Sequence, residues 1–249
     1  MAIDKSSRLD IPLEDQRQAW NRWNAEAREH SVGGVSGVQA ETAEQWLNDL
    51  GRHDLNILDA GCGTGWFCQR LLRFGSVTGI DLADEVIQRA SQRVPQAKFI
   101  AGDVFSTELP RGHFDVVTSF EVLSHVADQP EFFRQLASLL KPNGVLILAT
   151  QNRPVLERWS VIGGPIPGQI RRWVDGKTLR SLVQQDFVVD ELTSICPVGD
   201  QGYLRFTNSR AFDWPTALLL GRKGRARLKA KLLLGHTLMV RARARKGTQ

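Results

Sequence analysis

The chain has 249 residues, of which 42% are hydrophobic and 24% are charged, and its net charge is +5. This length suffices for one sizeable buried core, and the composition is typical of a globular protein. Because no apolar run reaches about 18 residues, we predict no transmembrane helix, and the polar N-terminus argues against a secretory signal. The three cysteines lack CxxC spacing, which favours a reducing, cytoplasmic location over a disulfide framework.

Two helices are predicted near the N-terminus. Residues 13–29 and residues 38–50 carry apolar side chains at helical spacing, and a glycine-rich break separates them. We expect residues 1–51 to form an N-terminal helical cap on the remainder of the chain, 52–249.

Short apolar runs then alternate with helical patterns. The predicted strands are 56–60, 77–80, 98–101, 114–119, 145–149 and 187–192, and the predicted helices are 66–74, 84–93, 129–140 and 177–185. Strands that alternate with helices predict βαβ units, and therefore an α/β fold with a doubly wound, mainly parallel sheet covered by helices on both faces.

The chain is predicted to end in one more strand. Residues 237–245 alternate apolar and basic side chains, which indicates a strand with one exposed face. We expect it to be an edge strand, on which Arg241, Arg243 and Arg245 discourage aggregation. Residues 197–235 then form an insertion before this last strand.

The strongest functional signal is the sequence LDAGCGTG at residues 58–65, between a predicted strand and a predicted helix. Its alternating glycines, Gly61, Gly63 and Gly65, allow a tight turn and the close approach of a ligand. Asp81 ends the next strand, about 20 residues on, where a carboxylate can bind ribose hydroxyls. Asp103 follows the third strand. These features share the carboxyl edge of the sheet, where open α/β sheets bind ligands.

A nicotinamide dehydrogenase is the competing interpretation of this loop. Its fingerprint is G-x-G-x-x-G. Counted from Gly61, the third glycine of that fingerprint is replaced by Trp66, and Asp59 lies two residues before the first glycine. These mismatches argue against a dehydrogenase.

The motifs taken together resemble those of class I methyltransferases, which use S-adenosylmethionine (SAM). ILDAGCGTGWF, GID, AGDVF, FDVVTSFEVLSHV and LLKPNGVLILAT match the family's motifs in order and spacing over residues 56–150. The resemblance implies a Rossmann-like, seven-stranded sheet with an antiparallel last strand. EVLSHV and LATQNRPVLERW are most similar to the ubiquinone-biosynthesis O-methyltransferases, which usually have glutamate where this chain has Ser124.

The same resemblance implies a role for each matching residue. Asp59, Gly61, Cys62, Gly63 and Gly65 would form the SAM loop. Asp81 would hold the ribose hydroxyls, Leu82 and Val104 would touch the adenine, and Asp103 would accept its amino group. Phe120 would line the methyl-donor pocket, and Trp20 would either cap the ligands or anchor its helix to the core. The product would be S-adenosylhomocysteine.

Methyl transfer to a hydroxyl needs alignment and the removal of a proton. His125 follows the fourth strand and is the best candidate for the base, although a structural role is an alternative. His30 is a second candidate, and Glu121 is expected to assist or to pair with His125. Because no His/Cys/Asp cluster has metal-ligand spacing, we predict no metal.

The expected acceptor is a small molecule, with a hydroxyl on a phenol, quinone precursor, sugar or natural product. The alternatives are an N-methyltransferase and a SAM-binding regulatory protein without turnover. Residues 218–234 are strongly basic and favour peripheral membrane contact, an anionic acceptor, RNA binding or simply a solvated helix face. Nucleic acid is the weaker partner, because residues 119–122 lack the motif of base-amino methyltransferases. The sequence does not predict the oligomeric state.

Overall fold

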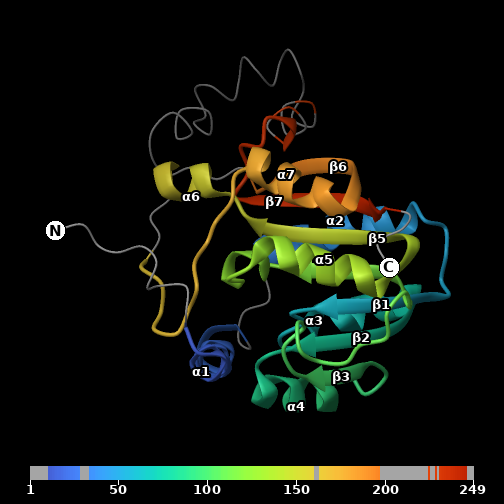
Figure 1. Cartoon of the computed structure of the whole chain (residues 1–249), viewed down its shortest axis with the longest axis vertical. Coiled ribbons are helices and arrows are strands. Elements are labelled where there is room, and N and C mark those ends of the chain that lie inside the picture. Colours follow the sequence, from blue (N-terminus) through green and yellow to red (C-terminus); the bar gives the residue numbers. More distant parts are fainter. Residues whose placement is uncertain are drawn as a thin grey trace.

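In the computed structural model, the residues that can be described are 11–28, 34–159, 163–196, 224, 228 and 230–245. These residues contain a seven-stranded sheet with the order β3-β2-β1-β4-β5-β7-β6 (Figure 1). The strands are β1 (Leu55–Ala60), β2 (Gly75–Asp81), β3 (Lys98–Ala101), β4 (Phe114–Phe120), β5 (Leu140–Gln151), β6 (Phe187–Ile195) and β7 (Thr237–Ala244). The first five strands pair in parallel, and β7 is antiparallel to both β5 and β6.

Helices cover both faces of this sheet. They are α1 (Leu13–Trp23), α2 (Val35–Asn48), α3 (Trp66–Leu71), α4 (Asp84–Arg93), α5 (Gln129–Leu139), α6 (Arg153–Trp159) and α7 (Gly176–Asp186). A π-helical turn (Asn24–Arg28) follows α1, and short 3₁₀ turns cover Leu72–Phe74 and Leu123–His125. The predicted doubly wound fold, with its antiparallel last strand, is confirmed.

Two apolar cores lie on opposite faces of the sheet. Leu146 and Leu148 of β5 point into one core with α5 and α7, whereas Val145 and Ile147 point into the other with α2 and α3. This alternation follows from the two-residue period of a strand, and it explains why β5 is continuously apolar over residues 145–149. Figure 1 shows α5 and α7 in front of the sheet.

The predicted N-terminal cap, 1–51, consists of two differently placed helices. The second, α2, belongs to a core, because Trp46 and Leu47 are buried against the sheet. In contrast, α1 lies beside α4, where Asn21 donates a hydrogen bond to Asp84 (2.8 Å). The α1 helix therefore covers the carboxyl edge of the sheet, while α2 supports the sheet from behind.

The predicted edge position of the last strand is wrong. β7 lies between β5 and β6, so its backbone is paired on both sides. Its arginines form ion pairs instead, Arg241 with Asp49 (3.0 Å) and Arg243 with Asp190 (2.8 Å). Alternating charge identifies a partly polar face, but it carries no information about neighbours in the plane of the sheet.

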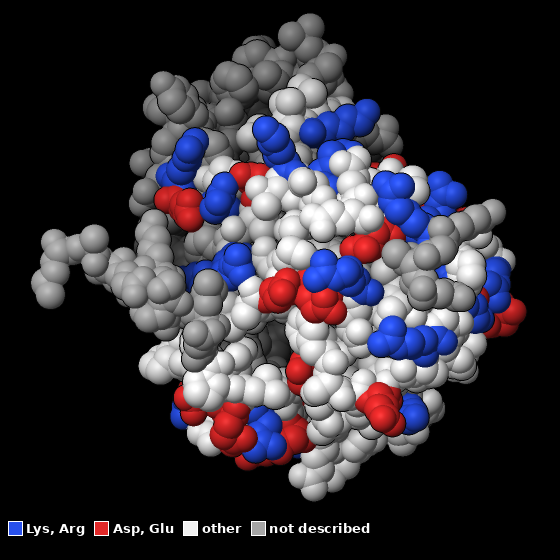
Figure 2. Space-filling view, in the orientation of Figure 1, with Lys and Arg blue, Asp and Glu red and all other residues white. Residues whose placement is uncertain are grey.

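Most of the predicted insertion, 197–235, lies outside the described residues, and so does most of the basic segment within it. On the face that Figure 2 shows, basic and acidic side chains of the described residues are interspersed. None of the helices in the described ranges is long and apolar enough to cross a membrane.

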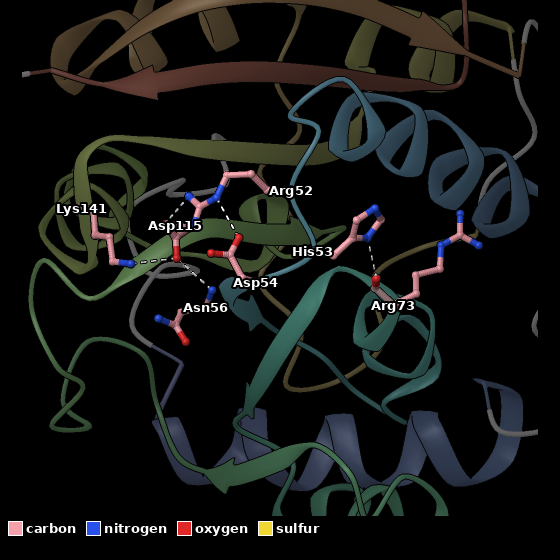
Figure 3. Close-up of polar contacts among 7 residues, drawn as sticks. All are labelled: Arg52, His53, Asp54, Asn56, Arg73, Asp115 and Lys141. Atoms are coloured by element: carbon pink, nitrogen blue, oxygen red, sulfur yellow. Dashed lines mark hydrogen bonds and ion pairs between the residues drawn. The ribbon is translucent and has the colours of Figure 1, made fainter.

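A polar cluster at the amino edge of the sheet connects β1, β4 and β5 (Figure 3). The Asp115 carboxylate accepts hydrogen bonds from Arg52 Nη1 (2.9 Å), Lys141 Nζ (2.8 Å) and the Asn56 N–H (2.9 Å). Burial alone would raise the pKa of Asp115, but the donors from Asn56, Lys141 and Arg52 hold it below its usual value. The cluster is far from the carboxyl edge, so we assign it to stability.

We expect Asp115→Ala to lower the free energy of unfolding by about 2–3 kcal/mol, because it leaves the Asn56 N–H and the Lys141 ammonium without their acceptor. Chemical denaturation measures this change. Asp54→Ala is the matched control, since Asp54 also pairs with Arg52 but its side chain is 77% exposed. An equal loss of stability in both variants would contradict the assignment.

Candidate active site at the carboxyl edge of the sheet

The glycine-rich turn after β1 passes closely under the loop that follows β4. Gly61 has a φ of +81°, and a Cβ at this position would lie 2.0 Å from Val122 Cγ2. Gly65 has a φ of +72° and packs against Phe99 at the start of α3. Glycine is therefore required at both positions by backbone conformation and by packing.

Asp81 at the end of β2 is fixed by the backbone of two loops. Its Oδ2 accepts a hydrogen bond from the Gly63 N–H (2.8 Å), and its Oδ1 accepts one from the Ala83 N–H (2.9 Å). Burial raises the pKa of this carboxyl in spite of these donors. A carboxylate offers about four acceptor positions. Two of them remain for two hydroxyl donors, which fits the vicinal diol of a ribose.

Asp59 at the end of β1 is deeply buried behind the glycine turn. Its carboxylate accepts hydrogen bonds from Thr118 Oγ1 (2.7 Å) and from Cys68 Sγ (3.4 Å). Burial raises the pKa of Asp59 to about 6, against the effect of these two donors, and the nearby Asp81 carboxyl adds to the increase. The carboxyl edge therefore holds two carboxylates that would gain from a cationic ligand.

Asp103 follows β3 and is held by its own turn. Its carboxylate accepts hydrogen bonds from the Phe105 N–H (3.2 Å) and from Ser106 Oγ (3.4 Å). The half-buried side chains of Leu82 and Val104 line the same cavity. An acceptor beside two apolar side chains fits an adenine ring, so the hydrogen-bond acceptors of this edge match an adenosyl group.

One cavity of about 810 Å³ brings most of the predicted site residues together, and its volume is in the range of cofactor sites. The predicted residues that line it are Trp20, Asp59, Gly61, Cys62, Gly63, Asp81, Leu82, Asp103, Val104, Phe120, Glu121 and His125. Gly65 is not among the lining residues, and its contacts explain it as a packing position. His30 lies outside the described residues.

His125 lies in the wall of this cavity, next to a backbone carbonyl group. Its Nδ1 lies 2.8 Å from the Ile170 carbonyl oxygen. Since a carbonyl only accepts, Nδ1 carries the proton and Nε2 keeps its lone pair. The Trp20 ring packs edge-on against the imidazole, with 4.6 Å between ring centroids. Burial lowers the pKa of His125 to about 4, so the ring is neutral at physiological pH.

Glu121 has an unusual backbone conformation at the end of β4. Its φ is +63°, which costs energy for a residue with a side chain. Its carboxylate accepts hydrogen bonds from Gln39 of α2 and from Thr237 of β7 (3.4 Å). Nδ1 of His125 bonds instead to the Ile170 carbonyl, and the expected assistance of His125 by Glu121 stays a prediction.

Several lining residues are absent from the predicted set. They are Asn24, Gln39, Gln151, Ile170, Arg171 and Trp173, among others. Most belong to segments that carry no sequence motif, and three of them lie in 163–175, a stretch between α6 and α7 for which the sequence predicts no element. Asn24 Oδ1 lies 3.6 Å from the Cβ position of Gly63, so the end of α1 reaches over the glycine turn.

The sheet order and this edge are those of the class I methyltransferase fold. The chain belongs to the methyltransferase domain family, whose model matches residues 36–190.

Curated relatives agree with this family. A ubiquinone biosynthesis O-methyltransferase of Bradyrhizobium diazoefficiens is 36% identical over 135 residues, covering 51% of this chain and 51% of that protein. A protein of the same name from Xanthomonas axonopodis pv. citri is 33% identical over 154 residues, covering 57% and 61%. The chain thus spans about half to three fifths of the length of the curated relatives it matches, so the likeness establishes the domain and not a substrate.

Solved structures share the fold. An S-adenosylmethionine-dependent methyltransferase from Mesorhizobium loti has a TM-score of 0.58 at 24% identity, covering 84% of this chain and 100% of that one. The N-methyltransferase NodS from Bradyrhizobium japonicum WM9, in complex with S-adenosylhomocysteine, has a TM-score of 0.64 at 16% identity, covering 92% and 98%. The predicted SAM-dependent methyltransferase is confirmed at the level of family and fold.

We expect Asp81→Ala to weaken the binding of S-adenosylhomocysteine by about 100-fold or more, because two hydrogen bonds to a charged group are lost. Isothermal titration calorimetry measures the affinity. Glu85→Ala is the control, since it removes the same charge from a side chain that is 67% exposed and outside the cavity. Unchanged affinity in Asp81→Ala would overturn the assignment of the ribose site.

Asp59 is expected to make stability fall as the pH rises. Its raised pKa means that the folded protein holds the proton more tightly, so its contribution is present below pH 3.8 and is lost as the pH rises through about 6. The shift of about two units corresponds to about 3 kcal/mol. The isosteric Asp59→Asn should therefore gain stability over wild type, by up to this amount, between pH 4 and 7.5.

Thermal or chemical unfolding of both proteins at each pH measures this difference. The comparison cancels other groups such as His125, whose lowered pKa acts with the opposite sign: its contribution is present above pH 6.5 and is lost as the pH falls through about 4. A stability difference that stays constant over this pH range would show that Asp59 does not titrate as stated.

Proposed function

We propose that this protein transfers a methyl group from SAM to a hydroxyl of a small molecule, such as a phenol, a quinone precursor, a sugar or another natural product. The observation that carries the proposal is the state of His125. Its Nδ1–H is committed to Ile170, so its Nε2 is an acceptor in the wall of the cavity that also contains Asp81 and the glycine turn. The curated relatives of the ubiquinone pathway, which are named O-methyltransferases, support the same reaction.

SAM, when bound, supplies a methyl group on a positively charged sulfur, and the sulfur leaves as a neutral thioether. Asp81 and Asp103 would hold the adenosyl part, and the neighbouring Asp59 would favour the positive charge. Because the leaving group needs no acid, the protein has two tasks left, which are to align the acceptor and to take its proton. Alignment alone supplies about 7–11 kcal/mol in favourable cases.

His125 takes the proton of the acceptor hydroxyl at Nε2. The hydrogen bond from Nδ1–H and the contact with Trp20 fix the imidazole ring. The position of Nε2 in the cavity wall is therefore defined as well. A hydroxyl must lose its proton on methylation and gains from this base, whereas a neutral amine attacks with its own lone pair. Nε2 as an acceptor therefore favours a hydroxyl over an amine.

We expect His125→Asn to lower kcat by about 10²–10⁴-fold, the usual contribution of a positioned base. Asparagine still donates to the Ile170 carbonyl, so the affinity for S-adenosylhomocysteine should stay unchanged. Turnover is measured as S-adenosylhomocysteine released with panels of phenols, catechols, sugars and aromatic amines. His113→Asn is the control, because His113 is exposed and outside the cavity.

The pH profile gives a second test of the same base. Because the pKa of His125 is about 4, kcat/KM should show a limb near pH 4, and not near 6.5, that disappears in His125→Asn. Near-normal turnover in the variant would leave alignment as the whole mechanism. Methylation of amines alone would establish the N-methyltransferase, and no turnover with bound SAM would favour a regulatory protein.

A further inference from the structure

The stretch 163–175, between α6 and α7, forms the part of the cavity wall that faces His125. It is fixed at several points: the Arg172 N–H donates to the Ser124 carbonyl (2.7 Å), and the Arg153 N–H donates to the Val174 carbonyl (2.9 Å). Gly168 packs on α1, where a Cβ would lie 2.7 Å from the Asp15 carbonyl oxygen. Figure 1 shows this stretch running down to α1. It therefore presents its side chains to the cavity from a defined backbone.

Arg171 of this stretch lines the cavity next to the residue that binds His125. Its Nη1 donates to the Gly163 carbonyl (2.6 Å), and its Nη2 donates to the Gly164 carbonyl (3.1 Å). The guanidinium also lies over the Trp173 ring, with 5.0 Å between Cζ and the ring centroid. These contacts hold the side chain in place with neutral groups.

Among the described residues, no carboxylate forms an ion pair with Arg171, whereas nine other described arginines have such a partner. Arg171 is also the only lysine or arginine among the described residues that line the cavity. Burial lowers the pKa of this guanidinium. A fixed, partly desolvated cation without a counter-ion is a binding site for an anion.

We propose that Arg171 binds a carboxylate of the methyl acceptor, so that the substrate is a hydroxyl compound that is also an acid. This inference rests on the proposed function and names the substrate class of the same site. The carboxylate supplies the counter-ion that the chain does not provide. With the acid group at Arg171, the acceptor is held beside His125, whose partner Ile170 is the preceding residue in the chain.

A carboxylate fits the electrostatics of the cavity better than a phosphate does. Among the described residues, six carboxyl groups line the cavity, namely Asp59, Asp81, Asp103, Glu121, Asp128 and Glu131. A phosphate carries up to two negative charges at neutral pH and meets stronger repulsion from these groups than a monoanion. The planar carboxylate also matches the planar guanidinium.

The test uses the full-length protein loaded with S-adenosylhomocysteine, titrated with 3- and 4-hydroxybenzoate and with the corresponding hydroxybenzamides as neutral isosteres. We expect the acids to bind about tenfold more tightly than the amides. This is the lower end of the gain in affinity from a charged pair, because Arg171 is partly exposed. In Arg171→Gln this preference should be lost, so that the acids and the amides bind with about equal affinity. Glutamine still donates a hydrogen bond toward the Gly163 and Gly164 carbonyls, so the stretch should stay folded. Arg171→Lys should keep part of the preference.

Arg180→Gln is the matched control, because it removes one positive charge from the exposed side of α7, outside the cavity, and should keep the tenfold preference. Equal binding of acids and amides to wild type, binding of neither, or an acid preference that survives in Arg171→Gln would overturn the proposal. Tighter binding of 4-hydroxyphenyl phosphate than of 4-hydroxybenzoate would also contradict it. Failure of the proposed function is distinguishable from these outcomes. It would be seen in the calorimetric and turnover measurements, as the absence of S-adenosylhomocysteine binding or of methyl transfer.

Discussion

The hydrogen bond between His125 Nδ1 and the Ile170 carbonyl (2.8 Å) joins the two halves of the active-site cavity. One half is the carboxyl edge of β1, β2, β3 and β4, and the other is the stretch 163–175. The bond fixes the tautomer of the imidazole, and thereby decides that Nε2 is the acceptor. It also fixes the backbone from which Arg171 reaches the cavity. The proposed base and the proposed anion site therefore depend on one short contact between distant parts of the chain.

The cofactor half depends on a different constraint, the accumulation of carboxylates at the ends of β1 and β2. Burial raises the pKa values of both Asp59 and Asp81, so their ionised forms cost folding energy. A cationic ligand beside them recovers part of this cost. The protein thus holds a site that is electrostatically incomplete without a positive partner, and a sulfonium satisfies this requirement. The two ionised carboxylates thus lower the folding stability at neutral pH, and the same two charges raise the affinity for a cationic cofactor.

The sequence predicts the cofactor half well because that half is local. The glycine turn, Asp81 and Asp103 each follow directly on a strand, and the sheet order places the ends of β1, β2 and β3 side by side. The same reasoning failed for β7, because the alternating arginines describe one face and not the strand's neighbours. It also failed to find Arg171 and Ile170, because the place of the stretch 163–175 is set by contacts with Ser124, Arg153 and α1 that no local pattern encodes.

The hydrogen bonds of Glu121 show why the pairing of chemical groups is harder to predict than their location. Its position after β4 is correct, yet its side chain bonds to Gln39 and Thr237, which are far away in the chain. His125, four residues later, is turned toward Ile170 by the 3₁₀ turn between them. Separating these two groups keeps a carboxylate from stabilising the imidazolium, and it agrees with the low pKa of His125.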